Sequence, residues 1–337
     1  MKEAALYEKL DSHFVKCHLC RHGCTVESGK KGICCVRLNE EGTLYTLVYD
    51  KVVSTNVDPI EKKPLFHFAP GTQSFSIATV GCNFRCSFCQ NHSISQMPRE
   101  VGRIVGDKYS PEQIAGLAVS ANCRSIAYTY TEPTIYYELA RDTMVEARKL
   151  GLLNVWVTNG YMTREMLEDS KGLIDAANVD LKAFSDRFYK KYCNARLEGV
   201  LDSLRFMKQL GIWVEVTTLL IPTLNDDPGE VRELAGFIRT DLGKETPWHV
   251  SRFYPRYKEQ ELPPTEVESL RHVRQIGLEE GLDYVYTGNV PHDPGEKTFC
   301  PGCSDLLIDR VGYSVKKCTS ESGLCPKCGY RINGVEM

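Results

Sequence analysis

Seven short runs rich in β-branched and aromatic residues alternate with amphipathic stretches from residue 75 to about residue 290. Such alternation predicts strand–helix–strand units and therefore a parallel sheet. Six units followed by a last strand favour an α/β fold in which the sheet curves into a partial (β/α)6 TIM-like barrel. A doubly wound open sheet is the competing architecture. The predicted strands cover residues 75–80, 125–130, 153–158, 177–182, 212–220, 248–254 and 283–287.

Three of the intervening stretches begin with a recognisable helix start. Residues 110–113 (SPEQ) combine a capping serine and a glutamine with proline at the first helical position. Residues 227–230 (DPGE) repeat this arrangement, and residues 265–268 (TEVE) predict a further capping box. We therefore expect helices to begin at these three places between the strands.

Unusual polar residues gather where the predicted strands end. In barrels of this kind the active site lies at the carboxyl ends of the strands. Solvent exposure alone does not readily explain polar residues at five strand ends. Their position therefore favours the barrel over the open sheet. They are Gly81 and Cys82 after the first strand, Thr131 and Glu132 after the second, Asn159 after the third, Asp180 and Lys182 at the fourth, and His249 and Arg252 in the sixth.

Three cysteines with C-x3-C-x2-C spacing, Cys82, Cys86 and Cys89, directly follow the first predicted strand. Thiolates are natural ligands of iron, and three are one short of the usual shell of a cubane cluster. One iron would then keep an open coordination site, beside which Phe88 supplies an apolar wall. The alternative is a three-cysteine zinc site completed by His92.

The loop GCNFRCSFCQN resembles the cluster loop of the radical S-adenosylmethionine (SAM) superfamily, with its motif Cys-x3-Cys-x-aromatic-Cys. The resemblance implies a [4Fe–4S] cluster on Cys82, Cys86 and Cys89, with the amino and carboxylate groups of SAM on the fourth iron. It also implies one-electron cleavage of SAM to methionine and a 5′-deoxyadenosyl radical, which abstracts a substrate hydrogen. An electron donor such as flavodoxin or ferredoxin would supply the electron.

The resemblance extends to residues that would contact SAM. Thr131 and Glu132 stand where the family has Gly-Gly-Glu-Pro, and the glutamate would accept a hydrogen bond from the SAM amino group. Asn159 would touch the ribose. Asp180-x-Lys182 resembles a strand of the glycyl-radical-enzyme activases; both residues, with Phe88 and His249, would line the SAM site. The ordinary alternatives are a helix cap for Glu132, an ion pair for Asp180 and Lys182, and a core histidine for His249.

Over nearly the whole chain, the sequence resembles the radical SAM enzymes of the AmmeMemoRadiSam system, which are homologues of pyruvate formate-lyase activating enzyme. The segments DPIEKKPLFHF, YTYTEP and DLKAF carry this resemblance together with the terminal cysteines. AMMECR1-like and Memo-like partners are implied by family association only, and no substrate is implied. Cys35 departs from the family, which usually has glycine there.

Two further groups of four cysteines lie near the ends of the sequence. Two C-x2-C pairs, Cys300 with Cys303 and Cys325 with Cys328, predict a structural zinc ribbon. A rubredoxin-like iron site, an auxiliary cluster and a nucleic-acid-reading ribbon are the alternatives. For the N-terminal group zinc is the first choice, with His18 and His22 nearby, and a second [4Fe–4S] cluster that relays electrons is the rival. Its members are Cys17, Cys20, Cys24 and Cys34.

These groups divide the chain into an N-terminal metal-binding module with its connector (1–73), a barrel (74–293) and a C-terminal ribbon (294–337). Within the first part, residues 42–53 predict a strand or hairpin, and residues 58–73 an extended connector. The four remaining cysteines are predicted to be small buried hydrophobes. They are Cys35, Cys123, Cys193 and Cys318.

Composition limits the classes of function. The formal net charge of −3 disfavours a nucleic-acid-binding protein. The charged start MKEAALYEKL resembles no signal peptide, and no apolar run is long enough to cross a membrane, so we expect a cytoplasmic protein. Fifteen cysteines then indicate metal binding rather than disulfides. The candidate functions are a catalytic radical SAM enzyme, a glycyl-radical-enzyme activase, and a non-catalytic metal-rich scaffold or zinc-ribbon binding protein.

Overall fold

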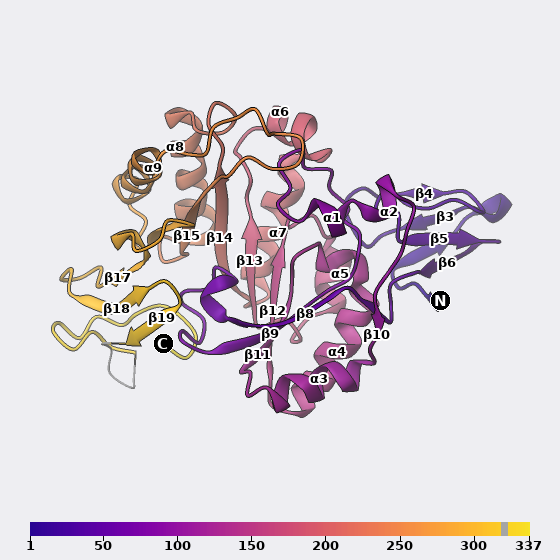
Figure 1. The fold of residues 1–337 in the computed structure, drawn as a ribbon, viewed down its shortest axis with the longest axis horizontal. Helices are drawn as coiled ribbons and strands as arrows, with labels where there is room; N and C mark the ends of the chain where they lie inside the picture. Colours follow the sequence, from indigo (N-terminus) through magenta and orange to yellow (C-terminus); the bar gives the residue numbers. More distant parts are fainter. Residues whose placement is uncertain (318–322) are drawn as a thin grey trace.

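A computed structural model describes residues 1–317 and 323–337 (Figure 1). Its centre is an eight-stranded sheet in the order β16-β15-β14-β13-β12-β11-β9-β8, parallel except for the antiparallel edge strand β8. In the described residues the two edge strands do not pair, so the barrel stays open. The strands are β8 (Ser54–Pro59), β9 (Gln73–Ala78), β11 (Ser125–Tyr128), β12 (Leu153–Thr158), β13 (Ala176–Asp180), β14 (Trp213–Leu220), β15 (Trp248–Arg252) and β16 (Val285–Gly288).

Helices cover the outer face of this sheet, and the prediction of a partial barrel is confirmed. Strand residues alternate: Trp156 faces the helices, whereas Val155 faces inward in one row with Ala127 and Ala176. The main helices are α3 (Pro111–Ser120), α4 (Tyr137–Lys149), α5 (Arg164–Asp169), α6 (Asp186–Phe188), α7 (Leu197–Gln209), α8 (Pro228–Phe237) and α9 (Val267–Glu279). The short helices α1 (His92–Ser95) and α2 (Met97–Glu100) follow the cysteine loop.

Helices begin at all three predicted places, and the predicted side-chain cap is confirmed at two of them. At α3, Ser110 and Gln113 form the reciprocal capping box, and at α8 the side chain of Asp227 accepts from the Glu230 amide. The predicted capping box at residues 265–268 is wrong: α9 begins at Val267 within this stretch, but in the described chain it has no side-chain cap. The Thr265 hydroxyl instead donates to the carbonyl of Leu220 at 2.5 Å, tying the chain before α9 to β14.

The segment predicted as an extended connector, residues 58–73, is instead part of the barrel. It completes β8, forms the short turn η2 (Ile60–Lys62) and then fills the inner face at the amino-terminal end of the strands. Leu65 and Phe68 are fully buried against the inward row of the sheet. The Glu215 carboxylate on β14 accepts both the Phe66 and His67 amides, at 2.9 and 2.7 Å. This segment therefore closes the floor of the barrel.

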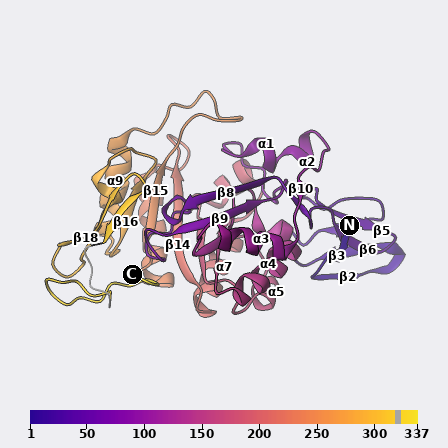
Figure 2. The same cartoon turned by 60° about the horizontal axis from the view of Figure 1, so that its bottom comes forward.

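Small β-modules stand at opposite ends of the long axis (Figures 1 and 2). Within residues 42–53, predicted as a strand or hairpin, the structure has the strand β6, which pairs with the preceding β5 outside that range, and residues 51–52, which pair with a distant strand. The module strands are β1 (Lys2–Glu3), β2 (Tyr7–Lys9), β3 (Val15–Cys17), β4 (Thr25–Val26), β5 (Arg37–Glu40), β6 (Thr43–Thr46), β7 (Lys51–Val52) and β10 (Asp107–Lys108) at the N-terminal end, and β17 (Thr298–Phe299), β18 (Leu306–Val311) and β19 (Ser314–Lys317) at the other.

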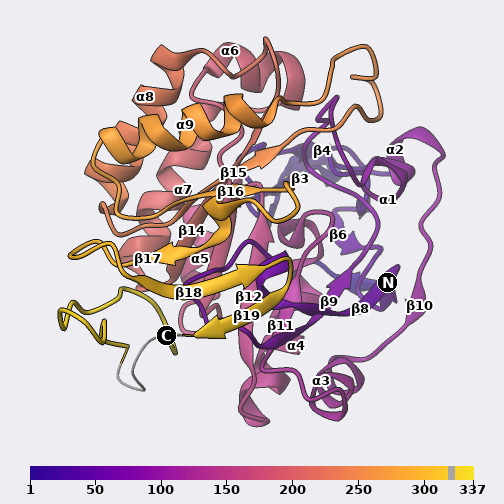
Figure 3. The same ribbon diagram turned by 60° about the vertical axis from the view of Figure 1, so that its left-hand side comes forward.

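The C-terminal ribbon packs beside β16 (Figure 3). Tyr284 and Tyr286 share a buried cluster with Phe66 of the barrel floor and with Cys300 and Cys325 of the ribbon. The division into three units stays a prediction, although β8 carries barrel structure into residues assigned to the first unit. None of the helices in the described part of the chain combines the length and apolar character that crossing a membrane requires.

Candidate active site

A cavity of about 310 Å³ opens at the carboxyl ends of the parallel strands. This is the end at which barrels of this type carry their active sites. All three cysteines of the central loop line the cavity, as do Phe88, Thr131, Asn159, Asp180 and Lys182. The structure thus brings together eight of the ten residues predicted for the cluster and SAM. The further lining residues are Lys62, Lys63, Phe84, Gln90, Asn91, Ser95, Thr129, Tyr130, Val157, Thr158, Thr217, Leu219, Ser251 and Asn289.

Backbone hydrogen bonds hold the cysteine loop against the turn that follows α6. The amides of Arg85 and Ser87 donate to the carbonyls of Cys193 and Tyr192, at 2.9 and 3.0 Å. Cys193 is fully buried beside Cys86 but is not among the described residues that line the cavity. The predicted burial of Cys193 is confirmed. The structure also shows that its backbone carbonyl supports the cysteine loop.

Polar groups approach the sulfur atoms of the loop. The Phe84 amide donates to Cys82 Sγ at 3.3 Å, and the Ser95 hydroxyl lies 3.3 Å from Cys89 Sγ. Burial raises the pKa of Cys82 and of Cys89, so these thiols need a bound cation to be held as thiolates at neutral pH. The alternative zinc ligand, His92, instead stacks on Tyr257 with ring centroids 4.6 Å apart.

Asp180 and Lys182 form an ion pair in the cavity wall. Lys182 Nζ lies 2.9 Å from Asp180 Oδ2 and 5.9 Å from the centre of the Phe88 ring. Burial opposes the charge on Lys182, but Asp180 and the thiol of Cys86 outweigh it and raise the lysine pKa. The pair thus places one fixed positive and one negative group beside the cysteine loop.

Glu132 is fully buried below the cavity wall, and its carboxylate is largely occupied. One oxygen accepts from the Thr134 amide, the Thr134 hydroxyl and the Thr158 hydroxyl, and the other accepts the Asn159 amide at 2.8 Å. Desolvation raises its pKa. The helix cap considered as an alternative is therefore present, and Glu132 also fixes the backbone of Asn159, whose side chain donates to Asn83 at 2.8 Å.

The structure does not bring His249 to the cavity, contrary to the prediction. His249 points inward on β15, two residues before Ser251, so it lies one layer deeper than the wall. Its Nε2 lies 2.7 Å from Glu215 Oε2, and its ring packs against Phe66 and Tyr286. It is the core histidine that the alternative described.

Thr217 is the most informative cavity residue that the sequence reasoning missed. Its hydroxyl is buried in the wall and has no hydrogen-bond partner within the described residues. A signal was available, because Thr217 follows Glu215 at the two-residue period of inward positions on β14. Lys62 and Lys63 were also missed, because their segment was expected to be a connector. Tyr130 was missed although it ends the predicted strand 125–130 and directly precedes Thr131.

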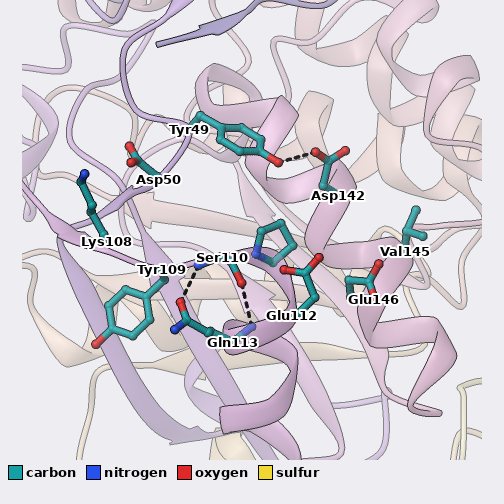
Figure 4. A pocket seen from close by; sticks show the side chains of 11 residues that line it. Tyr49, Asp50, Lys108, Tyr109, Ser110, Glu112, Gln113, Asp142, Val145 and Glu146 are labelled. Atoms are coloured by element: carbon teal, nitrogen blue, oxygen red, sulfur yellow. Dashed lines mark hydrogen bonds between the residues drawn. The ribbon is translucent and has the colours of Figure 1, made fainter.

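A larger hollow of about 650 Å³ lies away from the cysteine loop (Figure 4). It lies between the chain near β7, the start of α3 and one side of α4, and its described lining contains no cysteine. Tyr49 donates to Asp142 at 2.6 Å, and Ser110 and Gln113 are occupied in their capping box. The hydrogen-bonded side chains in Figure 4 thus serve the structure, and we do not assign a site to this hollow.

Both terminal cysteine groups come together in space. The four ribbon cysteines place their sulfur atoms within 4.8 Å of one another, which makes a four-cysteine metal site. The four N-terminal cysteines line one small cavity with Arg37. Of the remaining cysteines, Cys123 is buried as predicted, Cys35 is half-buried, and Cys318 lies outside the described residues. Cys35 has φ +62°, a conformation that glycine adopts more readily than other residues.

The radical SAM superfamily model matches residues 76–235, which span the cysteine loop and strands β11 to β14. The uncharacterized protein MJ0808 of Methanocaldococcus jannaschii is 48% identical over 335 residues, which are 99% of each chain. Together with the cysteine loop at the strand ends, these matches decide the family. The chain belongs to the radical SAM superfamily. Members of this superfamily are enzymes that use a [4Fe–4S] cluster and SAM.

More distant relatives of this superfamily member agree with that assignment. The pyruvate formate-lyase-activating enzyme of Clostridium pasteurianum is 23% identical over 165 residues, which are 47% of this chain and 66% of that protein. A radical SAM methyltransferase structure from Sphaerobacter thermophilus matches with a TM-score of 0.52 at 16% identity, covering 65% of this chain and 67% of that chain. This structural likeness shows the shared fold alone.

Proposed function

We propose that this radical SAM enzyme cleaves SAM reductively and uses the resulting 5′-deoxyadenosyl radical to abstract a hydrogen atom from its substrate. One observation carries the proposal: the three motif cysteines share a cavity with the Asp180–Lys182 pair and with the Thr217 hydroxyl, which has no hydrogen-bond partner among the described residues. When bound, the cluster and SAM supply the one-electron cleavage that yields methionine and the radical.

The residues present fit these two groups. The three thiols that line the cavity would offer ligands for three irons of a cubane cluster and leave the fourth iron without a protein ligand. The Thr217 hydroxyl is a buried polar group that needs a partner, and a bound ligand in this cavity would provide one. Asp180 and Lys182 offer complementary charges to the amino and carboxylate groups of an amino acid moiety.

The chain's own residues then have distinct roles. We assign Phe88, Thr131, Asn159, Asp180 and Lys182 to the SAM-lining wall. Glu132 acts as a positioning residue, because its carboxylate holds the Asn159 amide and the Thr158 hydroxyl. The closed floor formed by residues 60–69 keeps water out from below, which protects a radical from quenching.

Anaerobically reconstituted protein with dithionite and SAM should produce 5′-deoxyadenosine, and Cys86→Ala should abolish its formation. Cys123→Ala removes a buried thiol outside the cavity and serves as the matched control, with product formation retained. Product is quantified by liquid chromatography with mass spectrometry. Unchanged cleavage by Cys86→Ala would overturn the assignment of the central loop.

A glycyl-radical-enzyme activase is the second candidate, supported by the Asp180-x-Lys182 pair in the cavity and by the similarity to an activating enzyme. Its substrate hydrogen would come from a glycine Cα of a partner protein. A desalted lysate of cells grown on α-deuterated glycine should then transfer deuterium into 5′-deoxyadenosine. Product without deuterium, formed in the same lysate, argues for a different substrate.

Three further assignments stay proposals. We propose zinc for the ribbon, because four thiolates within 4.8 Å match one tetrahedral ion. Membership of the AmmeMemoRadiSam group, with AMMECR1-like and Memo-like partners and a flavodoxin or ferredoxin as donor, rests on sequence resemblance. A non-catalytic scaffold or zinc-ribbon binding protein is the alternative of another class, and it predicts metal binding without SAM cleavage.

A further inference from the structure

Four cysteines of the N-terminal module surround one small cavity beside the barrel. Cys17, Cys20, Cys24 and Cys34 line it together with apolar side chains, among them Ile135 of the barrel. Cys17 and Cys34 are buried, and the other two are half-buried. Four thiols that face one enclosed space are arranged to hold a metal centre.

The spacing of these sulfur atoms distinguishes one ion from a cluster. Four sulfurs at about 2.3 Å from a single zinc ion lie within roughly 4.6 Å of one another. The ribbon cysteines meet this condition, with Cys300 and Cys328 sulfurs 3.5 Å apart and Cys303 and Cys325 sulfurs 3.6 Å apart. Among the described residues, they form the one group of three or more ligand atoms that lies so close. The four N-terminal sulfurs do not meet this condition in their present arrangement.

The central loop supplies an internal standard for the wider spacing. Cys82, Cys86 and Cys89 carry the superfamily's cluster motif. In the described chain their sulfur atoms also do not form a group that lies within 4.8 Å of one another. In a cubane each thiolate binds a different iron at a different corner, so its sulfurs stand farther apart than those around one ion. The N-terminal group thus resembles the cluster loop and differs from the ribbon.

We propose that Cys17, Cys20, Cys24 and Cys34 hold a second [4Fe–4S] cluster. Arg37, which is buried and ion-paired with Glu138, donates to Cys17 Sγ at 3.1 Å and would offset part of the negative charge of the four thiolates. Four cysteines close the shell, so this cluster differs from the central one in having no iron open to a substrate.

Histidine does not compete for this site. His22 Nε2 lies 2.9 Å from the Asn83 carbonyl, and its ring packs edge-on against Tyr161. His18 lies beside Glu8 at 3.4 Å, and neither histidine is among the described residues that line the cavity.

The second cluster would lie directly behind the active-site loop. A Cβ atom on Gly81 would stand 3.4 Å from the Cys34 carbonyl oxygen and 2.7 Å from Val36. Arg99 of α2 donates to the Ile33 carbonyl at 2.8 Å and to the Cys82 carbonyl at 3.4 Å, which ties the two cysteine loops together. Figure 1 shows α2 next to the N-terminal module.

This placement suits a one-electron relay to the active-site cluster. A reduced flavin or iron–sulfur protein would give one electron to the second cluster, which would pass it on, and each SAM cleaved would consume one. The relay role rests on the proposed function, whereas the metal content does not. The two ideas are therefore tested by different measurements.

The metal content is tested in a variant without the central site. Full-length protein with Cys82, Cys86 and Cys89 all changed to alanine is purified anaerobically, and its iron, sulfide and zinc are measured. We expect about four irons, four sulfides and one zinc per chain, with the visible and Mössbauer spectra of a cubane. About two zincs and no iron would overturn the proposal, whatever the enzyme does with SAM.

A second pair of variants separates ligand loss from unfolding. In the otherwise unchanged chain, C20S with C24S should lose about four irons and keep the electron paramagnetic resonance signal of the central cluster. Cys35→Gly, beside Cys34 but outside the cavity, is the control and should keep all irons. Retention of full iron by the double variant contradicts the site.

If the relay operates, the rate of SAM cleavage driven by a protein electron donor is at least tenfold lower in the double variant than in the unchanged protein. An unchanged rate contradicts the relay but not the metal site.

Discussion

Thr217 is the residue on which the proposed ligand site depends most, because its buried hydroxyl lines the cavity and has no partner among the described residues. Sequence patterns located Asp180, Lys182 and Asn159 because polar residues at strand ends are visible without a structure. They did not locate Thr217, because a threonine inside an apolar strand is typical of ordinary β-structure. They also misplaced His249, because the depth of an inward residue depends on how neighbouring strands are staggered, which residue identity does not reveal.

Thr217→Val should weaken SAM binding by about tenfold, because it removes one buried hydrogen bond and keeps the shape of the side chain. The measurement is equilibrium dialysis of radiolabelled SAM with reconstituted protein. Thr143→Val on α4 is the matched control, since its buried hydroxyl also lacks a partner in the described chain but lies outside the cavity. Equal SAM affinity for both variants would refute a role for Thr217.

The segment from β8 to β9 is the element that sequence reasoning understood least. Its prolines and lysines are typical of a loop, and its apolar residues show no helical or strand period. It is buried because a curved parallel sheet leaves an inner floor to be filled, which only the tertiary structure defines. The helix starts at Ser110 and Asp227 were predicted correctly because capping is a local interaction.

His67 in this segment should make stability fall in mild acid. Burial lowers its pKa to about 4, and Glu215, Arg310 and His249 are the charged or titratable groups that face it. Its ordinary pKa near 6.5 applies in the unfolded chain. The unfolded state therefore takes up the proton first, so the stabilisation is complete above about pH 6.5 and is lost as the pH falls towards 4.

The expected loss is on the order of 3 kcal/mol for wild type across that range. Urea unfolding followed by tryptophan fluorescence at several pH values measures it. In His67→Asn the slope between pH 6.5 and 4 should be shallower. The same slope in both proteins would show that other groups cause the acid sensitivity.

The molecule as a whole is a barrel that lies between two small cysteine-rich β-modules. The four-cysteine groups and the barrel were predicted from spacing and periodicity, both of which are properties of the sequence alone. How the modules dock was not predicted, because the contacts depend on distant single residues. Arg310 of β18 is one of these: it is buried and donates to the Phe66 carbonyl at 2.8 Å.

Loss of the ribbon metal should therefore destabilise the barrel as well as the ribbon. Cys303→Ser combined with Cys325→Ser should remove one metal ion per chain and lower the melting temperature by about 5 °C or more. Differential scanning calorimetry and metal analysis of the same samples provide the measurement. Cys123→Ser is the control, and an unchanged melting temperature after loss of the metal would show that the ribbon is an independent appendage.

The buried floor of the barrel also has a consequence for the order of folding. Residues 60–69 leave the ribosome before strands β9 to β16 are made, yet His67 reaches Glu215, 148 positions later, and Asn333, 266 positions later. Contacts over such separations form slowly, because a long stretch of chain must first be brought together. The early segment must wait, with its apolar side chains exposed, until nearly all of the protein has been made. In the nascent chain, residues 60–69 are thus the segment most exposed to aggregation or to binding by chaperones.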